Sequence, residues 1–116
     1  MNRYIMIGKN SQETAASMLN KPQNRKELNK PLFDAFNVKI IEFLYFNNSD
    51  FDVLVTIEAE NDEIVAAATN LVYASGAFNF ITWFRAFEAD EWKNIYQSAS
   101  ENMASYISAK QRAQEG

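Results

Sequence analysis

The chain of 116 residues contains no cysteine and no histidine. The absence of cysteine excludes disulfide bonds, thiolate zinc sites, iron–sulfur clusters and cysteine nucleophiles. The absence of histidine excludes a Ser-His-Asp triad, a histidine general base and a histidine-ligated haem or zinc. Any acid–base chemistry must therefore fall to carboxylates, phenols and arginine.

Glycine is also scarce, with three residues in the whole chain. Three glycines do not make a glycine-rich phosphate-binding loop, and no acidic cluster has the spacing of a calcium-binding loop. Nothing in the sequence supports an all-carboxylate metal site. We therefore predict that the protein uses no cofactor and no metal ion.

Positive charge is in deficit, because 11 Lys and Arg residues stand against 15 Asp and Glu residues and give a formal net charge of −4. A nucleic-acid partner would require clustered positive charge, whereas the basic residues here are scattered. No apolar run approaches the ~18–20 residues of a membrane span, and the N-terminal apolar run is too short for a signal peptide. We therefore expect a cytoplasmic protein that binds neither nucleic acid nor membranes.

Aromatic side chains, in contrast, are abundant, with nine Phe, five Tyr and two Trp residues. A chain of this length is expected to form one domain, because domains cluster around ~100–150 residues. So many aromatic side chains exceed what the core of one small domain needs. We therefore predict a single domain over residues 1–116 with a second apolar surface outside its core.

Hydrophobic periodicity divides the chain into alternating strands and helices. The predicted strands cover 3–9, 38–46, 51–58 and 78–85, and a turn at 47–50 joins the second and third into a hairpin. The predicted helices cover 11–19, about 23–36, about 62–75 and about 88–109, and a frayed tail follows at 110–116. Pro22 separates the first two helices, and Pro31 is expected to kink or break the second.

The order of these elements, β-α-β-β-α-β with an added C-terminal helix, is typical of the ferredoxin-like arrangement, an α+β fold. Its helices cover one face of a four-stranded antiparallel sheet. The strands at 38–46 and 78–85 carry apolar residues on both parities, so the second face cannot simply be exposed to water. We therefore predict a homodimer in which the free sheet faces pack into a shared α/β-barrel.

Five short segments, taken in chain order, match the motifs of a known protein family. The segments are Tyr4-Ile5-Met6-Ile7-Gly8-Lys9 before Asn10-Ser11, Pro22-Gln23-Asn24-Arg25-Lys26, Phe51-Asp52-Val53-Leu54-Val55-Thr56-Ile57-Glu58-Ala59, Ala74-Ser75-Gly76-Ala77, and Arg85. Over about positions 3 to 91 they resemble the GYD domain family of small bacterial and archaeal proteins, named for a Gly-x-Tyr-Asp hairpin. That hairpin here reads Ser49-Asp50-Phe51-Asp52, which keeps the aspartate but neither the glycine nor the tyrosine.

The resemblance implies the dimeric α/β-barrel fold, which is shared by cofactor-free antibiotic-biosynthesis monooxygenases, muconolactone isomerases and ligand-sensing regulatory domains. It carries over no activity, because a shared fold does not assign chemistry. The missing hydroxyl at Phe51 argues against any activity that would need it. For Arg25, in the second matched segment, we favour a structural role that anchors the restart of the helix.

Asp52, Thr56 and Glu58 form the most suggestive set of candidate site residues. They share one parity of the strand at 51–58, opposite the apolar parity that is expected to meet the helices. They would then point into the barrel, where a partly buried carboxylate can serve as an acid or a base. The alternative is a carboxylate near a strand end that faces water or pairs with a lysine or arginine.

Arg85 and Trp83 share one parity of the strand at 78–85. Directed into the barrel, Arg85 would hold an anionic substrate group or stabilise an enolate, and Trp83 would form a wall of the pocket. The alternative for Arg85 is a salt bridge with an acid at the edge of the sheet.

Two tyrosines, a phenylalanine and a glutamate complete the candidate set. Tyr45 is expected as a catalytic phenol and Tyr4 as a substrate-binding one, against the alternative of core tyrosines with satisfied hydroxyls. Phe43 would form another wall of the pocket. Glu42 is the one acid in an otherwise apolar strand, and its neighbours of the same parity predict burial, so it needs a partner or a function.

The sequence leaves several functions open. In the first, a homodimeric barrel binds an apolar or aromatic small molecule and acts on it by proton transfer, in an isomerase-, cyclase- or monooxygenase-like reaction with Asp52 as the acid–base group. In the second, the protein is a non-catalytic ligand-sensing or structural module. A cavity of about 300 Å³ or more, lined by Asp52 and Arg85, would favour the enzyme. A third option is a subunit of a larger assembly, recruited through its C-terminal helix.

Overall fold

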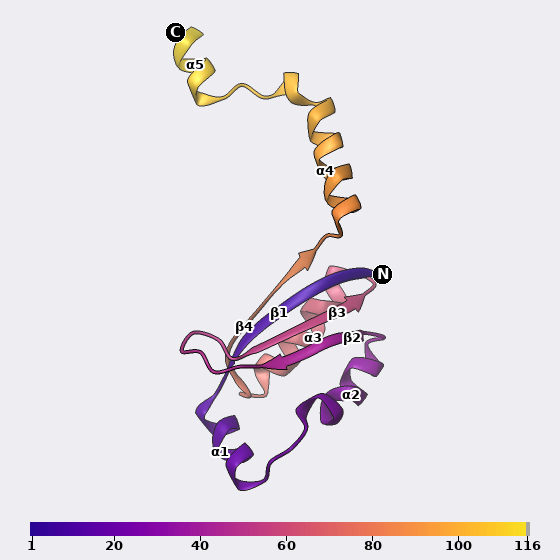
Figure 1. The fold of residues 1–116 in the computed structure, drawn as a ribbon, viewed down its shortest axis with the longest axis vertical. Helices are drawn as coiled ribbons and strands as arrows, with labels where there is room; N and C mark the ends of the chain where they lie inside the picture. Colours follow the sequence, from indigo (N-terminus) through magenta and orange to yellow (C-terminus); the bar gives the residue numbers. More distant parts are fainter. Residues whose placement is uncertain (116) are drawn as a thin grey trace. The chain divides into compact units, whose positions relative to one another are not determined.

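The computed structural model describes residues 1–115, which divide into two compact units, residues 1–86 and the segment from residue 87 onward. The first unit contains a four-stranded sheet and three helices (Figure 1). Its elements in chain order are β1 (Asn2–Asn10), α1 (Gln12–Asn20), α2 (Arg25–Ala35), β2 (Lys39–Tyr45), β3 (Val53–Ala59), α3 (Asp62–Ala74) and β4 (Phe78–Ala86).

The four strands form one antiparallel sheet in the order β2-β3-β1-β4. The hairpin predicted from the sequence is the pair β2–β3. Helices connect β1 to β2 and β3 to β4, which is the ferredoxin-like arrangement of an α+β fold. The predicted fold class is confirmed, and the arrangement is consistent with a subunit of an α/β-barrel.

Cross-strand pairing sorts the side chains of the sheet onto two faces, since residues opposite one another in antiparallel strands point the same way. Met6, for example, lies opposite Val55 of β3 and Trp83 of β4. The face that we call the helix-side face carries Tyr4, Met6, Gly8, Ile40, Phe43, Tyr45, Val53, Val55, Ile57, Ile81, Trp83 and Arg85. The face that we call the open face carries Arg3, Ile5, Ile7, Lys9, Lys39, Glu42, Leu44, Leu54, Thr56, Glu58, Phe80, Thr82 and Phe84.

The hydrophobic core lies between the helix-side face and the helices α2 and α3. Phe33 of α2 and Val65 of α3 are buried in the same cluster as the apolar residues of β1 and β3. Along β3, Val53, Val55 and Ile57 are buried and alternate with partly exposed residues. The apolar parity predicted for this strand therefore does meet the helices.

A bulge in β2 changes the faces that the sequence predicts for that strand. The register shifts between Ile40 and Glu42, where Ile41 is an extra residue. Ile40 and Phe43 therefore both lie on the helix-side face, and Glu42 lies exposed on the open face. The predicted burial of Glu42 is wrong, because simple alternation misses an inserted residue and because β2 is an edge strand.

Side-chain caps fix where the first two helices begin. Ser11 Oγ accepts a hydrogen bond from the Thr14 N–H at the start of α1, and Asn24 Oδ1 accepts one from the Glu27 N–H at the start of α2. Helix α2 then continues through Pro31 without the break that the sequence allowed. The proline deprives the Glu27 carbonyl of a donor, but Glu27 is exposed, so water can take the donor's place.

The second unit is helical and consists of α4 (Ala89–Glu101), the 3₁₀ turn η1 (Met103–Ser105) and α5 (Ala109–Glu115). The predicted continuous helix over 88–109 is wrong, because Asn102 leaves helical backbone angles and its Nδ2 donates to the Ser98 carbonyl at 2.9 Å. Residues 110–115, predicted to be frayed, belong to α5, and residue 116 lies outside the described residues. The single domain over 1–116 stays a prediction.

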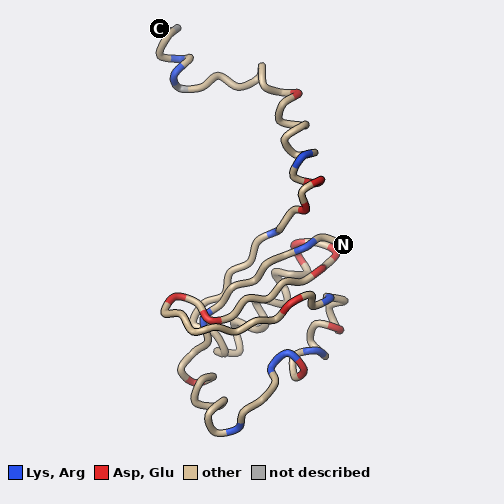
Figure 2. The backbone as a smooth tube through the Cα atoms, in the orientation of Figure 1, with Lys and Arg blue, Asp and Glu red and all other residues tan. Residues whose placement is uncertain are grey.

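Acidic and basic residues are interspersed along the backbone of both units (Figure 2). None of the helices in the described part of the chain is both long enough and apolar enough to cross a membrane. The cytoplasmic location and the lack of a nucleic-acid or membrane partner stay predictions.

Candidate functional site

The residues predicted to form one site are divided between the two faces of the sheet. Asp52 lies beside the end of β1, since its N–H donates to the Gly8 carbonyl at 2.9 Å. Arg85 pairs with Tyr4 near the beginning of β1, and the four residue steps from Tyr4 to Gly8 span about 13 Å of strand. The structure therefore does not bring together the predicted catalytic pair of Asp52 and Arg85.

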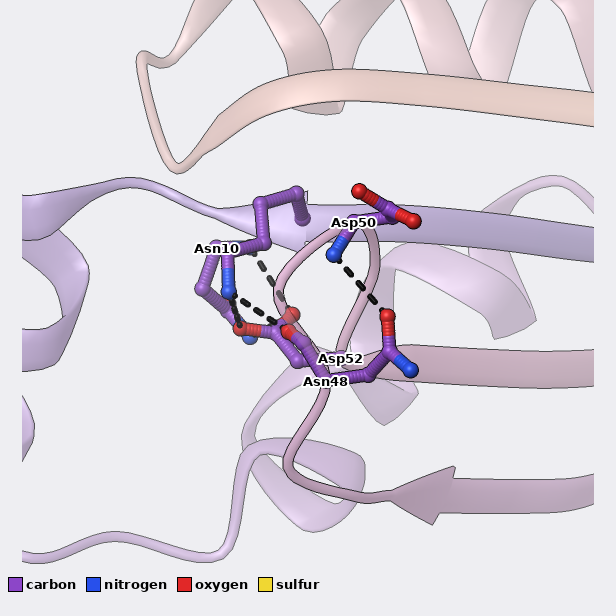
Figure 3. Close-up of polar contacts among 5 residues, drawn as sticks. Asn10, Asn48, Asp50 and Asp52 are labelled. Carbon is purple, nitrogen blue, oxygen red and sulfur yellow. Dashed lines mark hydrogen bonds and ion pairs between the residues drawn. The ribbon is translucent and has the colours of Figure 1, made fainter.

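The Asp52 carboxylate is occupied by neighbouring donors (Figure 3). Its Oδ1 accepts hydrogen bonds from both the backbone N–H and the side-chain Nδ2 of Asn10, each at 2.9 Å. Its Oδ2 lies 3.5 Å from Lys9 Nζ. These contacts tie the β2–β3 loop to the end of β1, which agrees with the paired carboxylate that the sequence left as the alternative.

The rest of the β2–β3 loop is held by short polar contacts and a ring pair. Lys9 Nζ donates to the Asn48 carbonyl at 3.0 Å, and the Asp50 N–H donates to Asn48 Oδ1 at 2.9 Å (Figure 3). The rings of Phe46 and Phe51 meet edge to face with their centroids 5.4 Å apart. Phe51 therefore packs within the loop and brings no polar group to it.

Tyr4 is a core residue with a satisfied hydroxyl. Its side chain is fully buried, and its hydroxyl donates to Asp62 Oδ1 at 2.6 Å. Burial, followed by this hydrogen bond, raises the pKa of Tyr4 above its ordinary value. Its ring meets Trp83 edge to face at 5.9 Å, and Trp83 packs against the core. Both residues thus belong to the interior, while Arg85 on the same face is exposed.

Three predicted polar residues, Glu42, Thr56 and Glu58, lie on the open face. They therefore do not border Tyr45 or Arg85, which lie on the helix-side face. Glu58 Oε1 accepts a hydrogen bond from Arg3 Nη2 at 3.4 Å. Thr56 lies between Ile5 and Glu42, and within residues 1–115 its buried Oγ1 has no hydrogen-bond partner. Thr56 and Glu58 therefore belong to a surface that α1, α2 and α3 do not cover.

A different part of the molecule is hollow. Two hollows of about 230 and 190 Å³ are both lined by Asn10, Thr14, Arg25 and Tyr45. These residues come from the end of β1, from α1, from the first turn of α2 and from the end of β2, and we call the two hollows together the α1–α2 cleft. Of the predicted site residues, the cleft includes Tyr45, Phe43 and Asp52.

The inner wall of the α1–α2 cleft is apolar. Leu32, Phe43, Val72 and Phe78 line the larger hollow and also a gap of about 40 Å³ in the core beneath it. The rings of Phe43 and Tyr45 lie 5.4 Å apart, so the aromatic surface continues along β2 to the mouth. An apolar body could therefore enter from the mouth toward the core.

The mouth of the cleft is polar. Arg25 Nη1 donates to Gln23 Oε1 at 3.3 Å, and no ion pair to Arg25 occurs in the described part of the chain. Burial raises the pKa of the half-exposed Tyr45 hydroxyl, with the nearby Arg25 charge opposing the shift and Asp52 reinforcing it. A cation and a protonated phenol thus lie at one opening.

Sequence reasoning missed most of this cleft. No motif or periodicity marks Asn10, Thr14 or Asn29 as site residues, and the role predicted for Arg25 is structural. The available signal was the position of Arg25 directly after the cap of α2, which turns a long cation toward the neighbouring strand end. Among the described residues, no three acidic side chains gather into a group that could hold a metal ion.

Comparison with protein families matches residues 4–96 to the model of the GYD domain. The resemblance predicted over about 3 to 91 is thereby confirmed. No curated protein matches the chain.

Proposed function

The chain belongs to the GYD domain family, whose match over residues 4–96 includes residues of all four strands. We propose that it is a homodimeric protein that binds an apolar or aromatic small molecule in the α1–α2 cleft. The observation that carries this proposal is a hollow of about 230 Å³ with aromatic and aliphatic inner walls and a polar mouth. Ligand sites combine mostly apolar walls with a few placed polar groups in this way. The proposal moves the site from the barrel interior to the helix side of each subunit.

The size of the cleft limits the ligand. Pockets for drug-sized molecules span about 300–1,000 Å³, whereas an apolar cavity of about 150 Å³ holds a benzene molecule. A hollow of about 230 Å³ therefore suits a single ring or a branched chain of similar size.

The open face supports the homodimer. Leu44, Phe80 and Phe84 are 51%, 38% and 46% exposed, and Ile5 and Ile7 lie between them on the same face. A contiguous apolar surface of this kind is a site of association. A second copy of the same sheet would cover it and form the barrel that the fold allows.

A cleft-filling variant tests the binding site. Asn29 lines the larger hollow from α2, so Asn29→Trp should fill it. Leu28→Trp, at an exposed position of the same helix, is the matched control. We expect saturation-transfer NMR with toluene and indole to detect binding to the wild type and to Leu28→Trp but not to Asn29→Trp. Equal binding to all three proteins, or binding to none, would overturn the proposal.

A second candidate function, proton transfer on the bound molecule, is supported by one observation: Tyr45 and Asp52 line the same hollow of about 190 Å³. An enzyme of this kind would exchange a carbon-bound proton of its ligand with solvent. In D₂O, wild-type protein should introduce deuterium into a small ketone or lactone, and Tyr45→Phe should not. If no compound exchanges, the protein is a binding module rather than an enzyme.

A further inference from the structure

The α1–α2 cleft has a distinct charge. Of the described residues that line its larger hollow, Arg25 is the one charged residue. The other polar groups in that lining are amides, hydroxyls and the Tyr45 phenol. A ligand that enters the hollow therefore meets a single positive charge at the mouth and apolar walls behind it.

The Arg25 guanidinium retains most of its donors. It donates one hydrogen bond, at 3.3 Å, to Oε1 of the neutral Gln23 side chain. The acids nearby do not neutralise it: Asp52 is held by Asn10 and Lys9, and no ion pair joins Glu13 to Arg25 in the part of the chain that the structure describes. A guanidinium has five N–H donors in a fork that fits a carboxylate in two-point contact.

Two further donors border the same opening. The Tyr45 hydroxyl is protonated at neutral pH at its ordinary pKa of 10.0 and can donate, and burial raises that pKa further. The Asn29 side chain lines the hollow and makes no hydrogen bond to another group within residues 1–115. One cation with neutral donors beside it matches a monoanion, whereas a dianionic phosphate would call for further cations, and Lys9 is already paired with Asp52.

We infer that the ligand of the α1–α2 cleft is a monoanionic carboxylate with an apolar body of about one ring, whose carboxylate is bound by Arg25 and whose body packs against Phe43, Leu32 and Phe78. This inference rests on the proposed function, because it names the chemical class of the molecule that the cleft takes. It gives Arg25 a role in binding in addition to its place at the start of α2.

Benzoate and its neutral analogue benzamide form a matched pair of probes. They share the ring and differ in charge, so the ratio of their dissociation constants isolates the contribution of the anion. We expect benzoate to bind the wild-type protein at least tenfold more tightly than benzamide. Added salt should weaken the binding of benzoate and leave that of benzamide unchanged, since screening acts on the charged pair.

Arg25→Gln removes the charge while keeping a polar side chain of similar length. We expect it to weaken benzoate binding at least tenfold and to leave benzamide binding unchanged. Lys26→Gln is the control, because Lys26 is the exposed neighbour that does not line the cleft. Thermal unfolding of each variant verifies that it is folded, and the salt dependence of the wild type provides a test that needs no variant.

The outcomes separate this inference from the proposed function. If benzamide and toluene bind as tightly as benzoate, and Arg25→Gln changes the binding of none of the three, the anionic class is wrong while the cleft remains a binding site. If benzoate binds equally to wild type and to Asn29→Trp, its site is elsewhere and the inference is wrong. If none of the probes binds the wild type, both proposals fall.

Discussion

The two faces of the sheet differ in what covers them and in how their polar groups are satisfied. On the helix-side face, Ile57 is 2% exposed and the hydroxyl of the fully buried Tyr4 is bonded to Asp62. On the open face, Phe84 is 46% exposed and the Thr56 hydroxyl has no partner within residues 1–115. The helices of the same chain bury the centre of the helix-side face, whereas the open face carries apolar side chains that only association would remove from water.

The largest expected effect is a difference in the free energy of unfolding between substitutions on the two faces. Ile57→Ala removes buried methyl groups from the helix-side core, so we expect the free energy of unfolding to fall by about 2–5 kcal/mol. Thr82→Ala, at an open-face position that is exposed in the single chain, should change it by no more than about 0.5 kcal/mol at a protein concentration below the dissociation constant of the proposed dimer. Urea denaturation measures both values. Similar losses at the two positions would mean that the faces are not as different as their burial indicates.

The next effect concerns association through the open face. Phe84→Glu places a charge in the proposed dimer interface, where it would be buried without a partner. We expect the dissociation constant of the dimer to rise by about a hundredfold, which corresponds to ~2.7 kcal/mol. Light scattering after size-exclusion chromatography reports the mass. Leu28→Glu, on the exposed surface of α2, is the control and should remain dimeric; a monomeric wild type would refute the dimer.

Asp52 lies at the end of the sheet where the two faces meet the β2–β3 loop. Asp52→Ala removes the acceptor of two Asn10 hydrogen bonds and the ion pair with Lys9, so we expect a loss of about 1–2 kcal/mol of stability. The backbone amide of Asn10 should exchange with deuterium faster. Asp50→Ala is the control, because Asp50 is exposed and its N–H, not its carboxylate, makes the contact to Asn48. Unchanged exchange at Asn10 would contradict the structural role of Asp52.

The smallest effect is specific to the helix-side face and depends on pH. Tyr4→Phe loses the hydrogen bond to Asp62, which should cost about 1 kcal/mol at neutral pH. Because the folded pKa of Tyr4 lies above its ordinary value of 10.0, the unfolded chain loses the proton first. The stability that Tyr4 contributes is therefore present below about pH 10 and is lost as the pH rises through the folded pKa.

Denaturation of wild type and Tyr4→Phe at about pH 8 and about pH 11 measures this difference. The advantage of the wild type should shrink at the higher pH. Tyr73→Phe, which removes the hydroxyl of an exposed tyrosine of α3, is the control for the substitution itself. An advantage that stays constant with pH would contradict the raised pKa of Tyr4.

The strands differ in how well the sequence pattern predicts which face of the sheet their side chains occupy. β3 alternates without interruption, so the parity of Val53, Val55 and Ile57 was predicted correctly. β4 is apolar on both parities, so the pattern could not decide whether Trp83 faces the helices or the open side. In β2 the bulge at Ile41 reversed the faces of the residues that follow it.

The candidate site was predicted only in part. Tyr45 and Phe43 do line a cleft, and Asp52 borders it, but the cleft lies on the helix side rather than in the barrel. Arg85 is absent from its lining because antiparallel pairing places Arg85 opposite Tyr4, at the far end of β1 from Asp52. No local pattern contains that pairing, since it joins residues about 80 positions apart in the chain.

By itself the sequence determined the order of strands and helices within residues 1–86, the membership of a family and the exclusion of histidine and cysteine chemistry. These properties depend on local periodicity and on composition, which a single chain carries in full. The tertiary structure decided which face each strand presents, which ends of the strands meet, and that Arg25 and Tyr45 border one cleft. The reason is physical: alternation fixes which residues share a face, but the identity of the face and the register come from long-range pairing and packing.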